Sequence, residues 1–506
     1  MRYFHQIRKK EKEILKVSQN ILMLCYVMIL AVILSYFVVG FETTLIIFLS
    51  LLSLLMLVES IVRVRFCRRQ NKSLSKSSKF EKSPKVSIHI AICNEPSDLV
   101  IKTVRAALQL NYENYEIVVL DNNTSDKKLW KPVREFCNRY PEKVIFKHFD
   151  RLDGYKAGAL NQCLKLMHPD TKYIFTVDAD YILKPDSLSK AVATIDGTNA
   201  AVVQFPQHYT LHHERHGLFN ELEHFFSGYA QAGNRSLSTL PTGTLSMIRV
   251  ESLLSVSGWP TESLTEDAHL GIKFLSEKFT TYFSNQILGQ GVMPGSIADL
   301  RKQRHRWVYG NTQCFLKFCS LRVKDQCKLS VFMQLSAWVN LLSFPIAFSL
   351  LYILAEIFTN WQISDWIPML ILGQFSIYVF GKLFLFLSNR KNTFQYNFKA
   401  FLIHIALSFE MAFSPIMAVV GMPASFVTTS KFASVSSLKH IPLRIPVLLL
   451  IMTMLLFAVG KTGIAMYSLQ VSLLFLLSGI YLYSEFTPKT INQLKIIPDE
   501  NSHSRA

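Results

Sequence analysis

Six apolar stretches, two before and four after a long polar region, constrain the fold of this chain more than any other feature. Each is comparable to the roughly 20 residues that a helix needs to cross a bilayer. They occur at 17–39, 44–64, 329–358, 366–387, 445–460 and 464–483, the third being unusually long and the fifth short. Mean hydropathy is +0.23. We therefore expect a membrane protein that carries a soluble domain between its second and third spans.

A further apolar run, 396–422, contains His404, Glu410 and Pro415. Unpaired polar groups are costly in lipid, so we predict an amphipathic or re-entrant element at the membrane surface. The alternative is an ordinary span that carries a functional buried Glu410.

The basic residues beside the spans predict their orientation, because Lys and Arg favour the cytoplasmic side. They cluster before the first span and after the second, whereas the turns 40–44 and 359–365 contain none. We therefore place the polar region and both termini in the cytosol of a multi-pass protein of the plasma (inner) membrane. This placement requires that 396–422 does not cross.

The chain has 54 basic and 36 acidic residues, a net charge of +18. Many of the basic residues flank spans, where anionic lipid headgroups attract them, so we expect contact with the bilayer and no nucleic acid partner. The eight cysteines form no CxxC pair, which disfavours a zinc site or a disulfide framework. The basic start lacks a small-residue cleavage site, so we expect an anchor and no removable signal peptide.

The polar region alternates between β-rich runs and helical patterns. Strands are predicted at 86–92, 115–120, 144–147 and 173–177, and a helix at 99–110. This alternation predicts an α/β fold with a doubly wound, mostly parallel sheet. Ligands of such sheets bind at the carboxyl ends of the strands. This sequence places there Glu95, Asp121, Asp178 and Asp180.

Asp178 and Asp180 follow a buried β-run and are separated by one small residue. Both carboxylates can face one hard divalent cation that also binds substrate phosphates. Such a cation would neutralise a departing diphosphate. Lys156 is suited to contact phosphate as a point charge. Its alternative is a solvated lysine at a helix start.

Two more clusters are suited to an acceptor. Asp267 is either a general base for an acceptor hydroxyl or a cap that favours the helix dipole. Gln303, Arg306 and Trp307 are spaced i, i+3 and i+4, so a helix places them on one face. Arg306 could hold diphosphate and Trp307 could stack under a sugar ring. The same helix could also anchor the chain at the membrane surface.

Residues 86–310 resemble the catalytic domain of the processive family 2 glycosyltransferases, the group of cellulose synthases and hyaluronan synthases. That family has an acidic residue after the second strand, then K-A-G-x-L-N, D-x-D, T-E-D and Q-x-x-R-W. This chain matches in the same order at Asp121, Lys156–Asn161, Asp178 with Asp180, Thr265–Asp267, and Gln303 with Arg306 and Trp307. The resemblance implies a GT-A-like domain inserted between α-helical transmembrane segments.

The resemblance also implies roles for the matched residues. The implied nucleotide-sugar site consists of Glu95, Asp121, Lys156, Asp178, Asp180 and Arg306, with Mg²⁺ or Mn²⁺ held by Asp180 and Asp178. Asp267 would deprotonate the acceptor hydroxyl and Glu266 would orient it. The implied acceptor-binding residues are Gln303, Thr265 and Trp307.

The resemblance extends to a gating loop, F-x-V-T-x-K in the family, which is similar to Phe426–Lys431. It implies that Thr429 and Lys431 close over the bound donor. The T-E-D form, rather than G-D-D, points to the cellulose-synthase side. Cys93 replaces a family tyrosine in the nucleotide motif, and the segments 203–207 and 240–244 depart from the family's acceptor motifs. Base preference and the identity of the polymer therefore stay open, cellulose included.

These inferences divide the chain into eight parts. They are a basic cytosolic N-terminus (1–16), two spans (17–64), a cytosolic glycosyltransferase domain with an amphipathic helix at its end (65–328), two spans (329–388), an interfacial helix (396–422), a gating-like loop (423–442), two spans (443–484) and a short cytosolic tail (485–506).

The expected function is processive, inverting polymerisation of a β-glycan from a nucleotide sugar, UDP-glucose foremost, with export across the membrane as in capsule or exopolysaccharide synthesis. The first alternative is transfer of a single sugar to a lipid carrier, against which Q-x-x-R-W and the gating-like loop count. The second is a non-catalytic scaffold or exporter, which the retained acidic residues disfavour.

Overall fold

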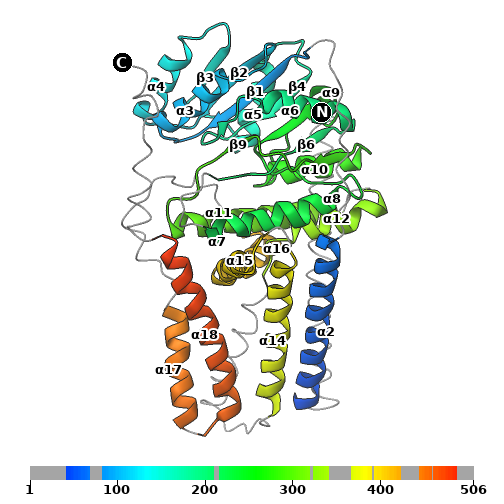
Figure 1. Cartoon of the computed structure of the whole chain (residues 1–506), viewed down its shortest axis with the longest axis vertical. Helices are drawn as coiled ribbons and strands as arrows, with labels where there is room; N and C mark the ends of the chain where they lie inside the picture. The colour runs from blue at the N-terminus through cyan, green and yellow to red at the C-terminus, as the bar shows by residue number, and fades with distance from the viewer. Residues whose placement is uncertain are drawn as a thin grey trace.

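The computed structural model describes residues 41–68, 83–209, 216–319, 323–340, 366–389, 392–422, 444–458 and 460–486. A sheet domain lies above a layer of roughly horizontal helices, and further helices run downward below that layer (Figure 1). The first predicted span at 17–39 lies outside the described residues, as does the predicted gating loop with Thr429 and Lys431.

The sheet has seven strands in the order β3-β2-β1-β4-β7-β6-β8. The strands are β1 (Val86–Ile92), β2 (Tyr115–Asn122), β3 (Val144–Phe149), β4 (Tyr173–Thr176), β6 (Val202–Gln204), β7 (Ser246–Arg249) and β8 (Thr281–Phe283). All neighbours pair in parallel except β7, which is antiparallel to β4 and β6. The predicted mostly parallel sheet is confirmed. The strands β6, β7 and β8, each three or four residues long, were not predicted.

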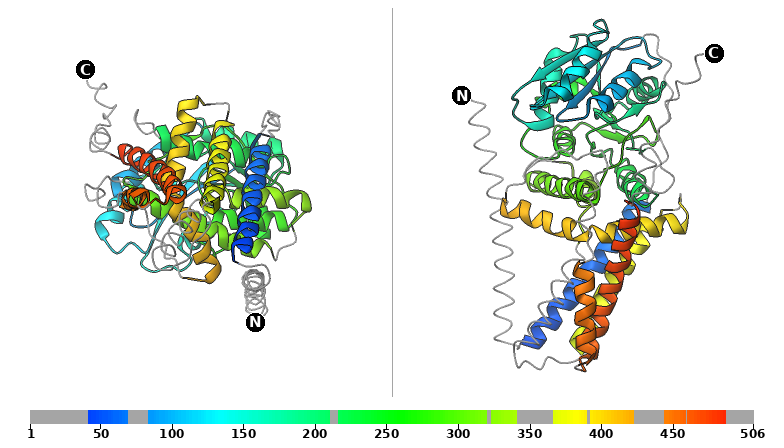
Figure 2. Two further views of the ribbon diagram at one scale, coloured as in Figure 1. Left: turned by 90° about the horizontal axis from the view of Figure 1, so that it is seen from below. Right: turned by 90° about the vertical axis from the view of Figure 1, so that its left-hand side faces the viewer.

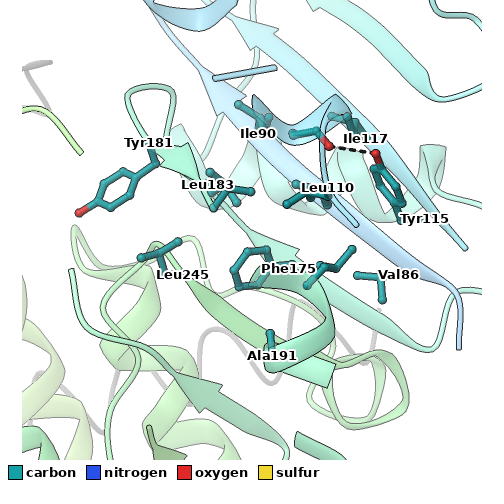
Figure 3. Packing of buried hydrophobic residues seen from close by; sticks show 14 of the residues in the cluster. Val86, Ile90, Leu110, Tyr115, Ile117, Phe175, Tyr181, Leu183, Ala191 and Leu245 are labelled. Atoms are coloured by element: carbon teal, nitrogen blue, oxygen red, sulfur yellow. Dashed lines mark hydrogen bonds between the residues drawn. The ribbon is translucent and has the colours of Figure 1, made fainter. Parts of the chain in front are cut away.

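The four predicted strands and the predicted helix are present. All four strands begin at the predicted residue, and the helix is α3 (Ser97–Leu108). Side chains alternate between the two faces: Ile117 and Val119 of β2 join one apolar cluster, and Val118 and Leu120 join another. The first cluster is drawn in Figure 3, where Val86 and Ile90 of β1 and Phe175 of β4 are among the labelled residues. Both faces are therefore buried, as a doubly wound sheet requires.

Further helices cover the sheet. They are α4 (Lys127–Cys137), α5 (Tyr155–Leu166), α6 (Ser187–Thr198), α9 (Val250–Ser255) and α10 (Glu266–Ser276), and the short strands β5 (Ile182–Leu183) and β9 (Gly289–Gln290) form a separate pair.

The helical layer below the sheet consists of α7 (His216–His224), the π-helix η1 (Phe225–Ala230), α8 (Gln231–Gly233), α11 (Ile297–Phe318), α12 (Asp325–Leu335), α15 (Phe394–Ala406) and α16 (Ser408–Val420). Within it α15 packs on α7, and α16 packs on α11. Figure 2 shows α15 and α16 lying across the upper ends of the long helices. The long helices are α2 (Phe41–Arg68), α14 (Trp366–Leu387), α17 (Arg444–Ala458) and α18 (Thr462–Ser484).

Among the described residues searched, two helices, Ile367–Leu387 and Thr462–Ser484, are long and apolar enough to cross a membrane. The pair α15 and α16, bent by 46°, would be a third if it were one span. The short fifth stretch forms a shorter apolar helix, Pro446–Ala458.

The third predicted span is wrong at its start. The helix α12 ends at Leu335 and a turn follows, so the described residues from 329 to 340 are not one continuous helix. Hydrogen bonds of Gln334 connect the end of α12 to the sheet domain. Gln334 accepts a hydrogen bond from the Leu240 amide at 2.8 Å and donates one to the Ser238 carbonyl at 2.9 Å. These bonds hold α12 against the sheet domain.

Candidate active site

One pocket lies between the carboxyl ends of β1 and β4 and the helix α11. The predicted residues on its walls are Glu95, Lys156, Asp178, Asp180, Thr265, Glu266, Asp267, Gln303, Arg306 and Trp307. They come from loops after β1 and β4, from Thr265 directly before α10, and from the helices α5, α10 and α11. The fold thus brings together clusters that are up to 212 residues apart in the sequence, between Glu95 and Trp307.

Asp178 and Lys156 face each other across the floor of the pocket. The Asp178 amide donates to the Thr244 hydroxyl at 2.9 Å, which fixes the turn after β4. Lys156 Nζ donates to the Asp178 carboxylate and, at 2.9 Å, to the Gly243 carbonyl. Burial alone would lower the pKa of Lys156, but the carboxylates of Asp178 and Glu266 raise it. Lys156 is therefore a charged wall residue of the pocket and not a solvated lysine.

Asp267 lies in the first turn of α10, where its Oδ1 accepts a hydrogen bond from the Ala268 amide at 2.7 Å. Burial, reinforced by the charge of Glu266, raises the pKa of Asp267 to about 7. Burial also raises the pKa of Glu266. A carboxylate whose pKa lies near neutrality is suited to general-base catalysis. Asp267 therefore fits both earlier alternatives: it accepts a hydrogen bond at the start of α10, and its raised pKa suits a general base.

Gly243 allows the close approach of this base to the pocket loop. Its φ is +84°, and a Cβ built on it would lie 3.0 Å from Asp267 Oδ2 and 3.4 Å from Lys156 Nζ. The left-handed backbone and the crowding both favour glycine here.

Gln303, Arg306 and Trp307 share one face of α11, as their spacing predicted. Burial lowers the pKa of Arg306, while the charges of Glu266 and Asp178 oppose that effect. Trp307 packs against Trp338 with ring centroids 5.2 Å apart. A smaller cavity, the acceptor cavity, continues from Asp267 and Trp307 to Leu335 and Trp338. A path thus leads from the proposed base toward the third apolar stretch.

Asp121 is not among the described residues that line the pocket. It is the last residue but one of β2 and is 1 % exposed. Its carboxylate accepts a hydrogen bond from the Thr124 hydroxyl at 2.7 Å and lies 2.6 Å from His148 Nδ1. Its neighbours Asn122 and Asn123 line the pocket instead. Thr429 and Lys431 are outside the described residues.

Sequence reasoning missed Arg304, which lies inside the Q-x-x-R-W motif but points away from the pocket. Its guanidinium lies 4.4 Å from the ring centroid of Trp307 and 4.7 Å from that of Trp338. It also pairs with the buried Glu221 of α7. Two arginines spaced by two residues on one helix lie on different faces, a signal that could have identified it.

A divalent cation fits this pocket only with help from a substrate. No group of three His, Cys, Asp or Glu residues in the described part of the chain could hold a metal ion. Asp178 and Asp180 nevertheless both line the pocket, where five carboxylates face two basic side chains. The donor set matches a hard cation bound by one or two carboxylates and by substrate phosphates.

Relatives of known activity resemble parts of this chain. A beta-monoglucosyldiacylglycerol synthase of Trichormus variabilis is 27 % identical over 259 residues, which cover 48 % of this chain and 52 % of that protein. The UDP-forming cellulose synthase catalytic subunit of Pseudomonas fluorescens is 29 % identical over 247 residues, 46 % of this chain and 32 % of that protein. The chain thus spans about half of the first relative's length and a third of the second's.

The mannosyltransferase PcManGT of Pyrobaculum calidifontis, solved with GDP-Man and Mn²⁺, shares the fold with a TM-score of 0.50 at 13 % identity, over 76 % of this chain and all of that one. The sequence model of glycosyl transferase family 2 matches residues 87–255, and that of glycosyl transferase family group 2 matches residues 173–461. The second match covers more than half of the chain, and the protein is therefore a glycosyltransferase that belongs to glycosyl transferase family group 2.

Proposed function

We propose that this protein is a membrane-embedded, processive and inverting glycosyltransferase that builds a β-glycan from UDP-glucose and passes the product across the membrane. The observation that carries the proposal is the shared pocket, in which Asp178, Lys156 and Arg306 surround the same space as Asp267 and Trp307. The acceptor cavity then extends from that space to Trp338.

The donor diphosphate would bind between Lys156 and Arg306, the two basic residues of the pocket. Asp178 and Asp180 would hold Mg²⁺ or Mn²⁺, which supplies positive charge to the departing diphosphate. Glu95 and Asp121 would position the nucleotide, Asp121 by fixing the loop of Asn122 and Asn123. Thr429 and Lys431 would close over the donor.

Asp267 would take the proton of the acceptor hydroxyl while Glu266 orients that hydroxyl. The hydroxyl oxygen forms a bond to the anomeric carbon, the bond from that carbon to the diphosphate oxygen breaks, UDP leaves and the proton stays on Asp267. Attack opposite to the leaving group converts an α-linked donor into a β-linked product. Trp307, with Gln303 and Thr265 beside it, would hold the terminal sugar of the acceptor.

Transfer of one sugar to a lipid is the second candidate. The similarity to the beta-monoglucosyldiacylglycerol synthase favours it, since the product named for that protein is a glycolipid. The acceptor cavity is largely apolar, with Leu222, Phe225 and Leu335 on its walls, and such walls suit a lipid as well as a sugar chain.

The membrane topology is part of the proposal. The glycosyltransferase domain at 65–328 and both termini would lie in the cytosol at the inner membrane, with 396–422 along its surface. The orientation of α15 and α16 across the ends of the long helices supports this placement (Figure 2). Reporter fusions at either end would test it, because a periplasmic signal at the C-terminus contradicts it.

The deciding experiment incubates the purified full-length protein with Mg²⁺ or Mn²⁺, lipid and a panel of nucleotide sugars, and measures UDP release, product size and linkage. We expect release from UDP-glucose together with a β-linked polymer, and none after chelation of the metal. A product of one sugar on lipid would replace the polymerase by the second candidate. No release from any donor would reject both.

A further inference from the structure

The buried carboxylate of Asp121 lies behind one wall of the catalytic pocket, where the ends of three strands meet. In the parallel ladders Asp121 of β2 lies between Ile92 of β1 and His148 of the edge strand β3. Four residues next to this junction line the pocket, namely Cys93, Glu95, Asn122 and Asn123. This wall includes the segment that resembles the family's nucleotide motif, and we call it the nucleotide wall.

Side-chain hydrogen bonds connect the loops of the nucleotide wall through Asp121. The Thr124 hydroxyl donates to Asp121 Oδ1 at 2.7 Å and accepts from the Asn94 amide at 2.8 Å. Asn123 exchanges two hydrogen bonds with the backbone of Leu152, at 2.9 and 2.8 Å. Asp121 and Thr124 are only 1 % and 2 % exposed, so water has little access to replace their bonds. The orientation of the Asp121 carboxylate therefore affects the loops after β1 and β2 together.

His148 fixes the other oxygen of that carboxylate. Its Nδ1 lies 2.6 Å from Asp121 Oδ2, and Nδ1 must donate because an ionised carboxylate only accepts. Hydrogen bonds that involve an ionised group are stronger than those between neutral groups. Burial raises the pKa of Asp121, whereas the hydrogen bonds from Thr124 and His148 oppose that effect. Both partners thus favour the ionised carboxylate that accepts their bonds.

The helix α4 holds the imidazole of His148 in place. The Trp130 ring of α4 stacks on it with ring centroids 4.0 Å apart and planes inclined by 14°. Arg134, one turn later, lies 5.0 Å from the centroid of the Trp130 ring, and α4 packs against β3 (Figure 1). His148 Nε2 lies 3.0 Å from Asp150, but the Asp150 side chain is 99 % exposed. Water competes for that second bond, so the bond to Asp121 is the one that orients the protein.

We propose that His148 is a positioning residue for the nucleotide-sugar donor, which acts through Asp121 on the loops of the nucleotide wall. The inference rests on the proposed function, because it takes this wall as the place where the nucleotide binds. His148 is not among the described residues that line the pocket, so it would act without contacting the donor. Asp267 and Trp307 are not part of its hydrogen-bond network, so loss of His148 should weaken donor binding and leave the chemical step intact.

The test compares two amides at position 148 in the full-length protein in detergent. The amide nitrogen of Asn takes the place of Nδ1, and that of Gln takes the place of Nε2. His148→Asn can therefore still donate to Asp121, whereas His148→Gln can donate only toward Asp150. In assays of UDP release with Mg²⁺, His148→Gln should raise the KM for UDP-glucose about tenfold and leave kcat nearly unchanged. His148→Asn should recover most of this loss.

His168→Gln is the matched control. His168 is exposed, lies 3.8 Å from an aspartate, Asp170, and is not among the described residues of the pocket, so KM should stay at the wild-type value. Thr124→Val is a second variant should His148→Gln fail to fold, as judged by its melting temperature. It removes the bond to the other oxygen of Asp121 with little change in volume, and it should raise KM in the same way.

Two results would overturn the inference while the proposed function stands. One is a KM for folded His148→Gln and Thr124→Val equal to that of His168→Gln. The other is a KM for His148→Asn as high as that for His148→Gln, because the bond to Asp121 would then not be the cause. Absence of UDP release by the wild-type protein would instead reject the proposed function, and this inference with it.

Discussion

The catalytic pocket and the helical layer below it both contain charged side chains. Acidic residues outnumber basic ones in the pocket, whereas in the layer a buried arginine and a buried glutamate pair one to one. In the pocket five carboxylates face two basic residues, and the Asp178 side chain is 37 % exposed. In the layer, Arg304 and Glu221 pair with side-chain exposures of 2 % and 1 %. Arg304 also donates to Gln303 Oε1 at 2.8 Å, and His404 Nδ1 lies 3.6 Å from Glu221.

The difference distinguishes two faces of α11: one lines the pocket, and the other holds the helix in position. The pocket is lined by more carboxyl groups than basic groups, which suits a substrate bound together with a cation. The layer pairs its charges within the protein, and Arg304 and Trp338 both pack against the ring of Trp307, which restricts that ring. One face of α11 thus contributes side chains to the pocket, and the opposite face fixes the helix through the buried pair of Arg304 and Glu221.

The largest expected effect concerns the pocket. Asp267→Asn should lower the rate of UDP release by about 10²–10⁴, the usual contribution of a general base, because an amide cannot take the proton. Donor binding, measured by equilibrium dialysis of UDP-glucose, should persist. If Asp267→Asn kept normal turnover, another residue would have to be the base.

Breaking the buried pair of Arg304 and Glu221 should lower the free energy of unfolding. Arg304→Met leaves Glu221 without its cation, and a lost partner in a buried pair costs about 3–5 kcal/mol. Thermal unfolding in detergent should show this as a large fall in melting temperature. The double variant Arg304→Met with Glu221→Leu should recover much of the loss, since no buried charge remains. A double variant as unstable as the single one would contradict the pairing.

The residues of the pocket could be predicted from the sequence, whereas the buried pair of the helical layer could not. β1 was predicted over its full length because its apolar run ends at Asn94, Glu95 and Pro96. The motif residues of the pocket were identified because short polar clusters follow strands or share a helix face. Arg304 and Glu221 are 83 residues apart, and no local pattern connects them. Only the tertiary structure shows that α7 brings Glu221 beside Arg304 of α11.

The start of the third predicted stretch is a similar case. Hydropathy alone placed it at Leu329, whereas α12 ends at Leu335 and its Gln334 bonds Ser238 and Leu240 of the sheet domain. These partners are about 95 residues away in the sequence, so no local pattern shows them.

A smaller effect should appear in the pH dependence. Because the pKa of Asp267 is raised to about 7, the rate should rise up to tenfold per pH unit below 7 and level off above it. The folded protein keeps this proton up to about pH 7, whereas an unfolded Asp loses it near pH 4. The free energy of unfolding should therefore fall as pH rises from about 4 to 7, relative to Asp267→Asn, which does not titrate there. Parallel stability curves for the two proteins would contradict the raised pKa.

The smallest effect provides a matched control for the buried pair. Arg301, one turn before Arg304 on α11, pairs with Glu410 of α16, but these side chains are 37 % and 14 % exposed. Both side chains are more exposed than those of the buried pair, so water screens this pair more, and Arg301→Met should cost clearly less than Arg304→Met. Because Arg301 is not among the described residues of the pocket, UDP release should be unchanged. A loss of stability equal to that of Arg304→Met would mean that burial does not separate the two pairs. In that case Glu410 would be essential to how α16 is held against α11, which would favour its alternative role as a functional buried residue in the 396–422 segment.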